Sequence, residues 1–126
     1  SKRAKAVPKS TTMISGLQVA SIIDGDETIK ACAATGGTGV LVSDEQVYDC
    51  QQLLAAREGI YAEPAGAVAL AGLRRALENG EIQPNEKAVC IITGSGFKDA
   101  ASTDEMIKNN PVSYLNSVGE MEKYLG

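Results

Sequence analysis

The chain has 126 residues, which is enough for one domain and too few for two. It contains no histidine, which excludes a Ser-His-Asp or Cys-His mechanism carried by this chain alone and any zinc site that needs histidine. The net charge is −4, yet four of the 12 basic residues lie within the first nine positions. The remaining acidic body argues against a nucleic-acid-binding groove.

The three cysteines, Cys32, Cys50 and Cys90, are odd in number and form no CxxC pair. We therefore expect reduced core residues in a cytoplasmic protein, and neither a disulfide framework nor a metal site. No apolar run approaches the roughly 20 residues that a membrane helix needs, and the start lacks the apolar region of a signal peptide. We expect neither a membrane nor a nucleic acid as a partner.

The first 15 residues are predicted to form an extended arm or linker, and residues 16–126 a single α/β unit. Within that unit, residues 16–23 are ambiguous between a strand and a short helix, and residues 24–26 (Asp-Gly-Asp) favour a turn. A short helix follows over about 27–34 and stops at Gly36 and Gly37. Its inner face is expected to hold Ile29, Cys32 and Ala33.

An apolar strand is predicted at 38–42, followed by a helix that begins after Ser43. Ser43 and Gln46 have the spacing of a capping box, in which each side chain satisfies a free backbone N–H at the helix start. Gly59 is expected to end this helix. The predicted inner face consists of Val47, Cys50 and Leu54.

Pro64 fits the first position of the next helix, because its missing N–H is not needed there, and Asn79–Gly80 closes that helix. A stripe of mostly small residues at spacing i+4 is expected to pack closely on a sheet: Ala65, Ala69, Leu73 and Leu77. A second strand at 88–92 is apolar on both faces, as in the centre of a parallel sheet.

Two further helices are predicted at the end of the chain, from Ser102-x-x-Glu105 and from Ser117-x-x-Glu120. The first is expected to stop at Asn110–Pro111. The second is expected to turn Val118, Met121 and Leu125 inward.

The order of these elements predicts a layered α/β fold with a parallel sheet and crossover helices. Two or three strands make a small sheet, so either the sheet continues in another part of a longer protein or the chain pairs with a copy of itself. An unpaired sheet edge makes self-association, for example as a homodimer, a hypothesis.

A glycine-bracketed turn follows the second strand, formed by Thr93, Gly94, Ser95 and Gly96 (the 93–96 turn). Ligands of α/β sheets bind outside the C-terminal ends of strands, so the hydroxyls of this turn are candidates for ligand contact. An ordinary strand-to-helix connection with the same glycines is the alternative. Glu63 is either a carboxylate aimed at a ligand from the start of a helix or a charge favoured there by the helix dipole.

Two other features favour structural interpretations. Residues 35–39 (Thr-Gly-Gly-Thr-Gly) could cradle a phosphate, but they follow a helix and lack the helix N-terminus that binds anions, so they favour a plain helix stop. Lys98 could form a covalent bond to a carbonyl compound if desolvated, but a surface lysine paired with Asp99 or a neighbouring acid is the simpler interpretation.

Two motifs in this order identify a family resemblance. EGIYAEPAGAVALAGL at 58–73 resembles a helix start of pyridoxal-phosphate enzymes of the tryptophan-synthase fold type (fold type II), and VCIITGSGFKD at 89–99 resembles the strand and turn of threonine synthases. Gly36–Gly37 and VLVSDE at 40–45 also match the general pattern. The resemblance covers about residues 10–126 and implies the C-terminal α/β portion of such an enzyme.

The resemblance implies pyridoxal 5′-phosphate as cofactor and a small amino-acid substrate. Thr93 would meet the pyridine nitrogen, Glu63 would lie near the ring, and Gly94, Ser95 and Gly96 would line the cofactor site. The lysine that binds the cofactor covalently lies upstream in the family, so Lys98 is not assigned that role and this chain alone is expected to be inactive. The implied reaction of the full enzyme converts O-phosphohomoserine and water to threonine and phosphate.

Two alternatives stay open at this point. The same family includes threonine and serine dehydratases and cysteate synthase-like enzymes, and Thr93 favours the threonine synthase because dehydratases more often place Ser or Cys there. A non-catalytic α/β module that binds a ligand or a partner is the alternative from another class.

Overall fold

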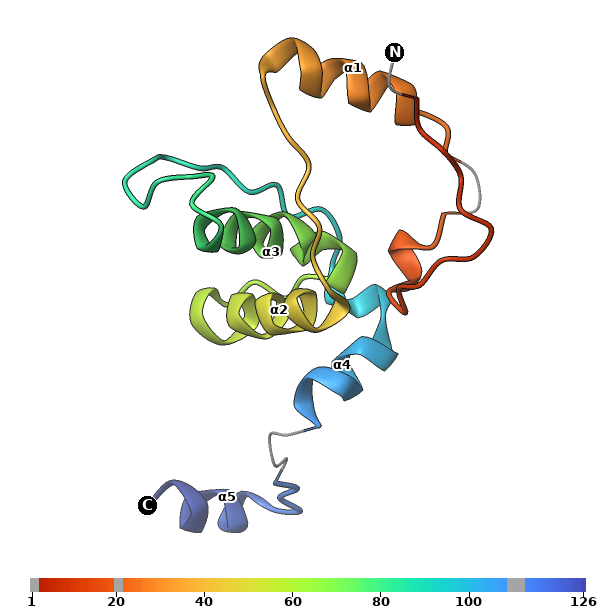
Figure 1. Ribbon diagram of the computed structural model, residues 1–126. Helices are drawn as coiled ribbons and strands as arrows, with labels where there is room; N and C mark the ends of the chain where they lie inside the picture. The colour runs from red at the N-terminus through yellow and green to blue at the C-terminus, as the bar shows by residue number, and fades with distance from the viewer. Residues whose placement is uncertain (1–2, 20–21, 109–112) are drawn as a thin grey trace.

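The computed structural model describes residues 3–19, 22–108 and 113–126. Its elements are η1 (Ser15–Leu17), α1 (Gly25–Thr35), α2 (Asp44–Glu58), α3 (Pro64–Glu78), η2 (Gly96–Lys98), α4 (Ala100–Ile107) and α5 (Val118–Leu125). Figure 1 shows α2 and α3 side by side, with α1 standing apart from this pair. No helix in the described ranges is both long and apolar enough to cross a membrane.

The predicted parallel sheet is wrong, because the described residues form helices and irregular segments with no β-strand. Their only β-type pairing is an isolated antiparallel bridge between Ala62 and Ser95. The segments 38–42 and 88–92 do carry strand-like apolar sequences, yet Leu41 is 95% exposed and Val89 92%. A strand needs a neighbouring backbone for its hydrogen bonds, and an apolar pattern cannot supply one.

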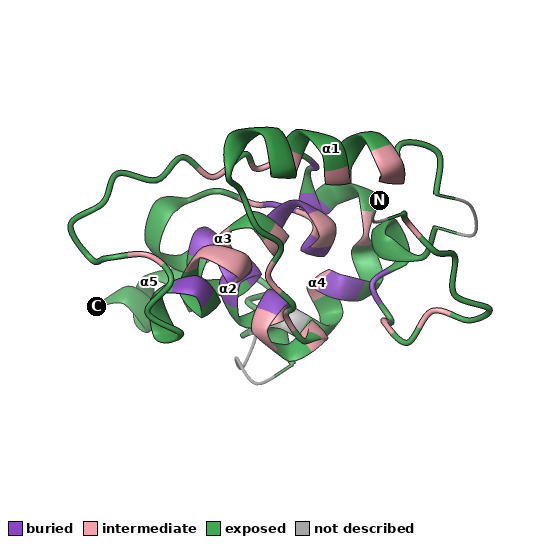
Figure 2. Cartoon of the chain, turned by 45° about the horizontal axis from the view of Figure 1, so that its top comes forward, coloured by how far each residue is buried: buried purple, intermediate pink, exposed green. Residues whose placement is uncertain are grey.

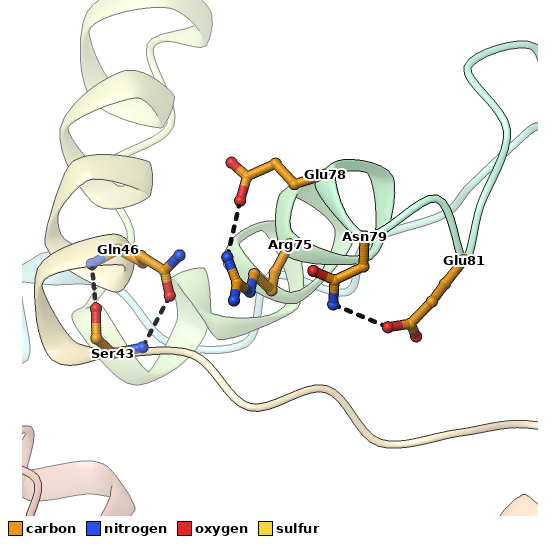
Figure 3. Close-up of polar contacts among 6 residues, drawn as sticks. All are labelled: Ser43, Gln46, Arg75, Glu78, Asn79 and Glu81. Carbon is orange, nitrogen blue, oxygen red and sulfur yellow. Dashed lines mark hydrogen bonds and ion pairs between the residues drawn. The ribbon is translucent and has the colours of Figure 1, made fainter.

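The α2 helix begins and ends as its sequence predicts. The Ser43 hydroxyl accepts from the Gln46 N–H at 3.2 Å, and the Gln46 side chain accepts from the Ser43 N–H at 3.0 Å, which completes the capping box (Figure 3). Gly59 ends the helix in the left-handed conformation at φ 67°, a conformation that glycine adopts without steric cost.

The core lies between α2 and α3, where buried residues concentrate (Figure 2). The predicted inner face of α2 is confirmed, since Val47, Cys50 and Leu54 are all buried. Opposite them, Ala67 and Ala71 are at most 2% exposed. Such small side chains let two helices approach closely. Ile14, within the predicted arm, completes the cluster at 2% exposed.

The buried face of α3 differs from the predicted stripe. Ala69 and Leu77 are exposed and Ala65 and Leu73 only half-buried, whereas the buried residues are Pro64, Gly66, Ala67, Ala71 and Ala76. Helix α3 has small residues on two faces, and it packs against α2 with one of them. The other face lies beside the segments at 38–42 and 88–92. There Ala69 and Leu73 line a groove together with Val40 and Val89.

Helix α1 includes Gly25, so the predicted turn at 24–26 is in fact a helix start. The predicted stop is confirmed: Gly36 has φ 69°, and Gly37 donates its N–H to the Cys32 carbonyl at 2.8 Å. Residues 35–39 therefore end a helix, as the structural interpretation expected. On the predicted inner face, Ile29 is half-buried and Ala33 exposed. In the ambiguous 16–23 region, the described residues include the end of η1.

Near the two ends of the chain, the structure confirms some of the predicted helix features and not others. Asp44 at the start of α2 accepts from the Met13 N–H at 2.6 Å, which ties the N-terminal segment to the core. Asp99, and not Ser102, caps α4, and the predicted stop at Asn110–Pro111 lies outside the described residues. The Ser117 cap of α5 is confirmed. The three residues of α5 expected to face inward are nevertheless exposed: Val118, Met121 and Leu125.

Candidate functional site

The structure brings the two sequence motifs into direct contact. The Glu63 N–H donates to the Gly94 carbonyl at 2.9 Å, and the Gly96 N–H donates to the Tyr61 carbonyl at 2.9 Å. These two bonds flank the Ala62–Ser95 bridge. The 93–96 turn is therefore fixed by its backbone to the residues that start α3.

Two glycines make this contact possible. A Cβ atom on Gly94 would collide with the Glu63 carboxylate, and one on Gly66 would lie 2.9 Å from the Gly94 nitrogen. Both sites are buried. The start of α3 can thus pack directly on the turn only while these positions carry no side chain.

Glu63 occupies the N-cap position of α3, but its side chain makes no capping hydrogen bond. The half-buried carboxylate instead lies against Gly94, where the N-terminal end of a 15-residue helix favours negative charge. The Glu63 carboxylate therefore lies next to the 93–96 turn and makes no capping hydrogen bond to α3.

The two hydroxyls of the turn have different surroundings. Ser95 is the N-cap of η2, and its oxygen accepts from the Phe97 N–H at 3.4 Å. Thr93 is exposed, and no hydrogen bond to its side chain is present in the described part of the chain. Thr93 is thus the hydroxyl of this turn that remains available to a ligand.

Tyr61 supports the turn from its other side and was missed by the sequence analysis. Its ring lies against Gly96, where a Cβ atom would lie 2.5 Å from the ring atoms. The ring also meets Phe97 edge to face with a centroid separation of 4.9 Å, and its hydroxyl forms a hydrogen bond with Thr103 of α4. The aromatic residue thus joins the turn, η2 and α4.

Gln51 is the second residue that sequence reasoning missed. Its side-chain nitrogen donates to the Ala62 carbonyl at 2.9 Å, and the residue is fully buried at 0% exposed. Its position in α2 was a detectable signal, because it shares the helix face of Val47, Cys50 and Leu54. A polar residue in an apolar face is worth examining for a specific hydrogen bond.

A profile of the family described as "Pyridoxal-phosphate dependent enzyme" matches residues 1–94, which include Glu63, Thr93 and Gly94. The chain belongs to this family. The resemblance deduced from the motifs at 58–73 and 89–99 is thereby confirmed, and pyridoxal phosphate is the cofactor of the family.

Curated relatives of this pyridoxal-phosphate enzyme chain are threonine synthases. The chain is 38% identical to the threonine synthase of Methanocaldococcus jannaschii over 78% of its own length and 25% of the relative's. For the threonine synthases of Halalkalibacterium halodurans and Methanosarcina acetivorans the identities are 32% and 36%, over 90% and 83% of this chain and 32% and 26% of the relatives. The chain thus spans between a quarter and a third of the length of these relatives.

The residues at the 93–96 turn fit one side of a pyridoxal-phosphate site. Thr93 presents an exposed neutral hydroxyl, and the Glu63 carboxylate lies next to it, against the buried Gly94. The exposed hydroxyl would offer one neutral polar group to the ring nitrogen of a flat heterocycle. The described residues contain no cluster of potential metal ligands, and the three cysteines are free.

Lys98 lies at the end of η2 and is exposed. The predicted pairing with Asp99 is not found, because the Asp99 carboxylate accepts from the Ser102 N–H at 3.1 Å, and the described part of the chain shows no ion pair for Lys98. This lysine therefore has the solvated surroundings of a surface residue.

Among the described residues, Tyr48 on α2 has a pKa that departs from its ordinary value. Burial raises the pKa of its phenol above the ordinary 10.0, and the negative charges of Asp44, Asp99 and Glu105 raise it further. The phenol therefore stays neutral near pH 7 and acts as a structural group where α2 meets α4.

Proposed function

We propose that the full-length protein containing this chain is a threonine synthase, which converts O-phosphohomoserine and water to threonine and phosphate. The observation that carries the proposal is the contact of the 93–96 turn with Glu63 at the start of α3. The threonine synthase names of the relatives support the choice of reaction within the family.

In this proposal the chain forms the side of the site that holds the pyridine ring. When bound, pyridoxal phosphate supplies the electron sink for breaking and forming bonds to the substrate's carbon atoms. The Thr93 hydroxyl would form a hydrogen bond with the ring nitrogen and, being neutral, would not hold a proton on it as a carboxylate would. Gly94 and Gly96 let Glu63 and Tyr61 pack directly on the turn, and Ser95 orients the turn through its cap on η2.

Glu63 contributes a fixed negative charge beside Gly94. Its main-chain N–H donates to the Gly94 carbonyl, which holds the backbone of Glu63 against the turn. We propose that the covalent attachment of the cofactor uses a lysine outside this chain and that Lys98 does not take part. A small amino-acid substrate and a cytoplasmic location complete the proposal.

The test is an assay of the full-length protein with candidate substrates. We expect phosphate release from O-phosphohomoserine, with no deamination of threonine or serine. Turnover of threonine or serine to an oxo acid and ammonia would identify a dehydratase instead and contradict the proposal.

The role of Thr93 is tested by Thr93→Val, which removes the hydroxyl and keeps the shape. We expect about a tenfold loss of kcat/KM, since one hydrogen bond of roughly 1–1.5 kcal/mol corresponds to about that factor. Thr35→Val, at an exposed position of α1, is the matched control and is expected to retain full activity. Equal activity of the two variants would contradict the proposed contact between Thr93 and the cofactor.

A further inference from the structure

One peptide group connects the core of the molecule to the candidate site. The peptide between Ala62 and Glu63 accepts from the Gln51 side chain through its carbonyl oxygen and donates to the Gly94 carbonyl through its N–H, both at 2.9 Å. A trans peptide is planar, and its C=O and N–H point in opposite directions. Holding the oxygen therefore also aims the N–H at the turn.

The donor in this arrangement is unambiguous. Because Ala62 contributes a carbonyl oxygen, only the nitrogen of the Gln51 amide can form the bond with it. The amide belongs to a side chain of α2 that neighbours the buried Cys50, so it is held by the α2–α3 core. The orientation of the 62–63 peptide is thus set by a side chain of the buried core between α2 and α3.

Packing alone does not account for glutamine at position 51. The Oε1 atom of Gln51 is buried and has no hydrogen-bond partner among the described residues. An unpaired buried acceptor costs free energy that an apolar side chain of the same length would avoid. The feature that only glutamine adds here is the hydrogen bond to Ala62.

We propose that Gln51 is a positioning residue for the cofactor site. It acts through the 62–63 peptide on the Glu63 carboxylate and on the turn that carries Thr93, without touching a ligand itself. The inference rests on the proposed function for its catalytic meaning, whereas the mechanical link from Gln51 to Gly94 stands on the hydrogen bonds alone.

The experiment compares Gln51→Met with Gln52→Met in the full-length protein. Methionine keeps the length of the side chain and removes the donor. Gln52 is the next residue of α2 and is exposed, so it is a matched control. The first readout is hydrogen exchange of the Glu63 amide, measured without cofactor. We expect Gln51→Met to raise its rate about fivefold, as for the loss of one ordinary hydrogen bond, with the unfolding temperature close to that of the control.

The second readout is the affinity for pyridoxal phosphate, which we expect to fall roughly fivefold in Gln51→Met and not in Gln52→Met. Equal Glu63 exchange in the two variants would overturn the proposal, and so would faster exchange with unchanged cofactor affinity. A general loss of protection across α2 and α3 would also overturn it, since that result marks a purely structural role. If the unmodified protein bound no pyridoxal phosphate, the proposed function would fail, while the exchange data would still decide the link from Gln51 to Glu63.

Discussion

The α2–α3 pair and the segments at 38–42 and 88–92 both carry aliphatic side chains, but the most exposed of these lie in the two segments. Leu54 in α2 is 6% exposed, whereas Leu41 in the first segment is 95% exposed. A helix satisfies its own backbone and needs a partner only for one face, whereas a strand needs a neighbour for its backbone as well. The comparison shows that aliphatic residues are buried where the segment satisfies its own backbone hydrogen bonds, as in α2 and α3.

The sharpest test of this comparison is to truncate one leucine in each region. Leu54→Ala is expected to lower the free energy of unfolding by about 2–5 kcal/mol, because it opens a cavity in the α2–α3 core. Leu41→Ala is expected to change it by no more than about 0.5 kcal/mol, because the side chain is already in solvent. Urea denaturation of both variants measures the difference. Similar losses would mean that the 38–42 segment is packed as tightly as the core.

A second test uses two glycines of α3. Gly66→Ala is expected to cost about 1–3 kcal/mol, because its Cβ would press against the Gly94 backbone. Gly72→Ala is expected to stabilise the chain by up to about 1 kcal/mol, since nothing beyond the neighbouring backbone of α3 lies within 4 Å of the added carbon and alanine favours a helix. Thermal unfolding gives both values, and a stabilising Gly66→Ala would show that the turn is not packed on α3.

The smallest expected effect is the contribution of Tyr48 to the pH dependence of the free energy of unfolding. The raised pKa means that the folded chain holds the phenolic proton more tightly than the unfolded chain does. The contribution to stability is therefore complete below pH 10.0, the ordinary pKa, and is lost as the pH rises through the folded value. Tyr48→Phe should flatten the fall in stability above that pH. The check is urea unfolding at a series of alkaline pH values, and an unchanged slope would assign the fall to other groups.

The sequence predicted the features that depend on neighbouring residues. The Ser43–Gln46 capping box, the left-handed Gly59 and Pro64 at a helix start all require only local geometry, and all are present. The sheet was wrong because an apolar run at 88–92 does not specify its partner strand. The face of α3 was wrong because small residues occur on two sides, and only the tertiary structure decides which side meets α2.

The candidate site shows the same division. The motifs around Glu63 and Thr93 were visible in the sequence, and the structure places them in contact. Gln51 and Tyr61 escaped notice because their roles are non-local: one supports a carbonyl 11 residues later, and the other reaches a threonine 42 residues later. Spacing within one helix can flag a buried polar residue, but it cannot name the group that the residue will meet.

The most direct test of the central claim is the affinity of the full-length protein for pyridoxal phosphate after Gly94→Ala. The added Cβ would collide with the Glu63 carboxylate, so the contact between the turn and α3 must shift. Gly39→Ala is the matched control, because nothing apart from its own chain neighbours lies within 4 Å of its added carbon. We predict that Gly94→Ala weakens cofactor binding by about tenfold or more, as for a loss of roughly 1.4 kcal/mol, while Gly39→Ala leaves it unchanged. Equal affinities in the two variants would contradict the assignment of the 93–96 turn to the cofactor site.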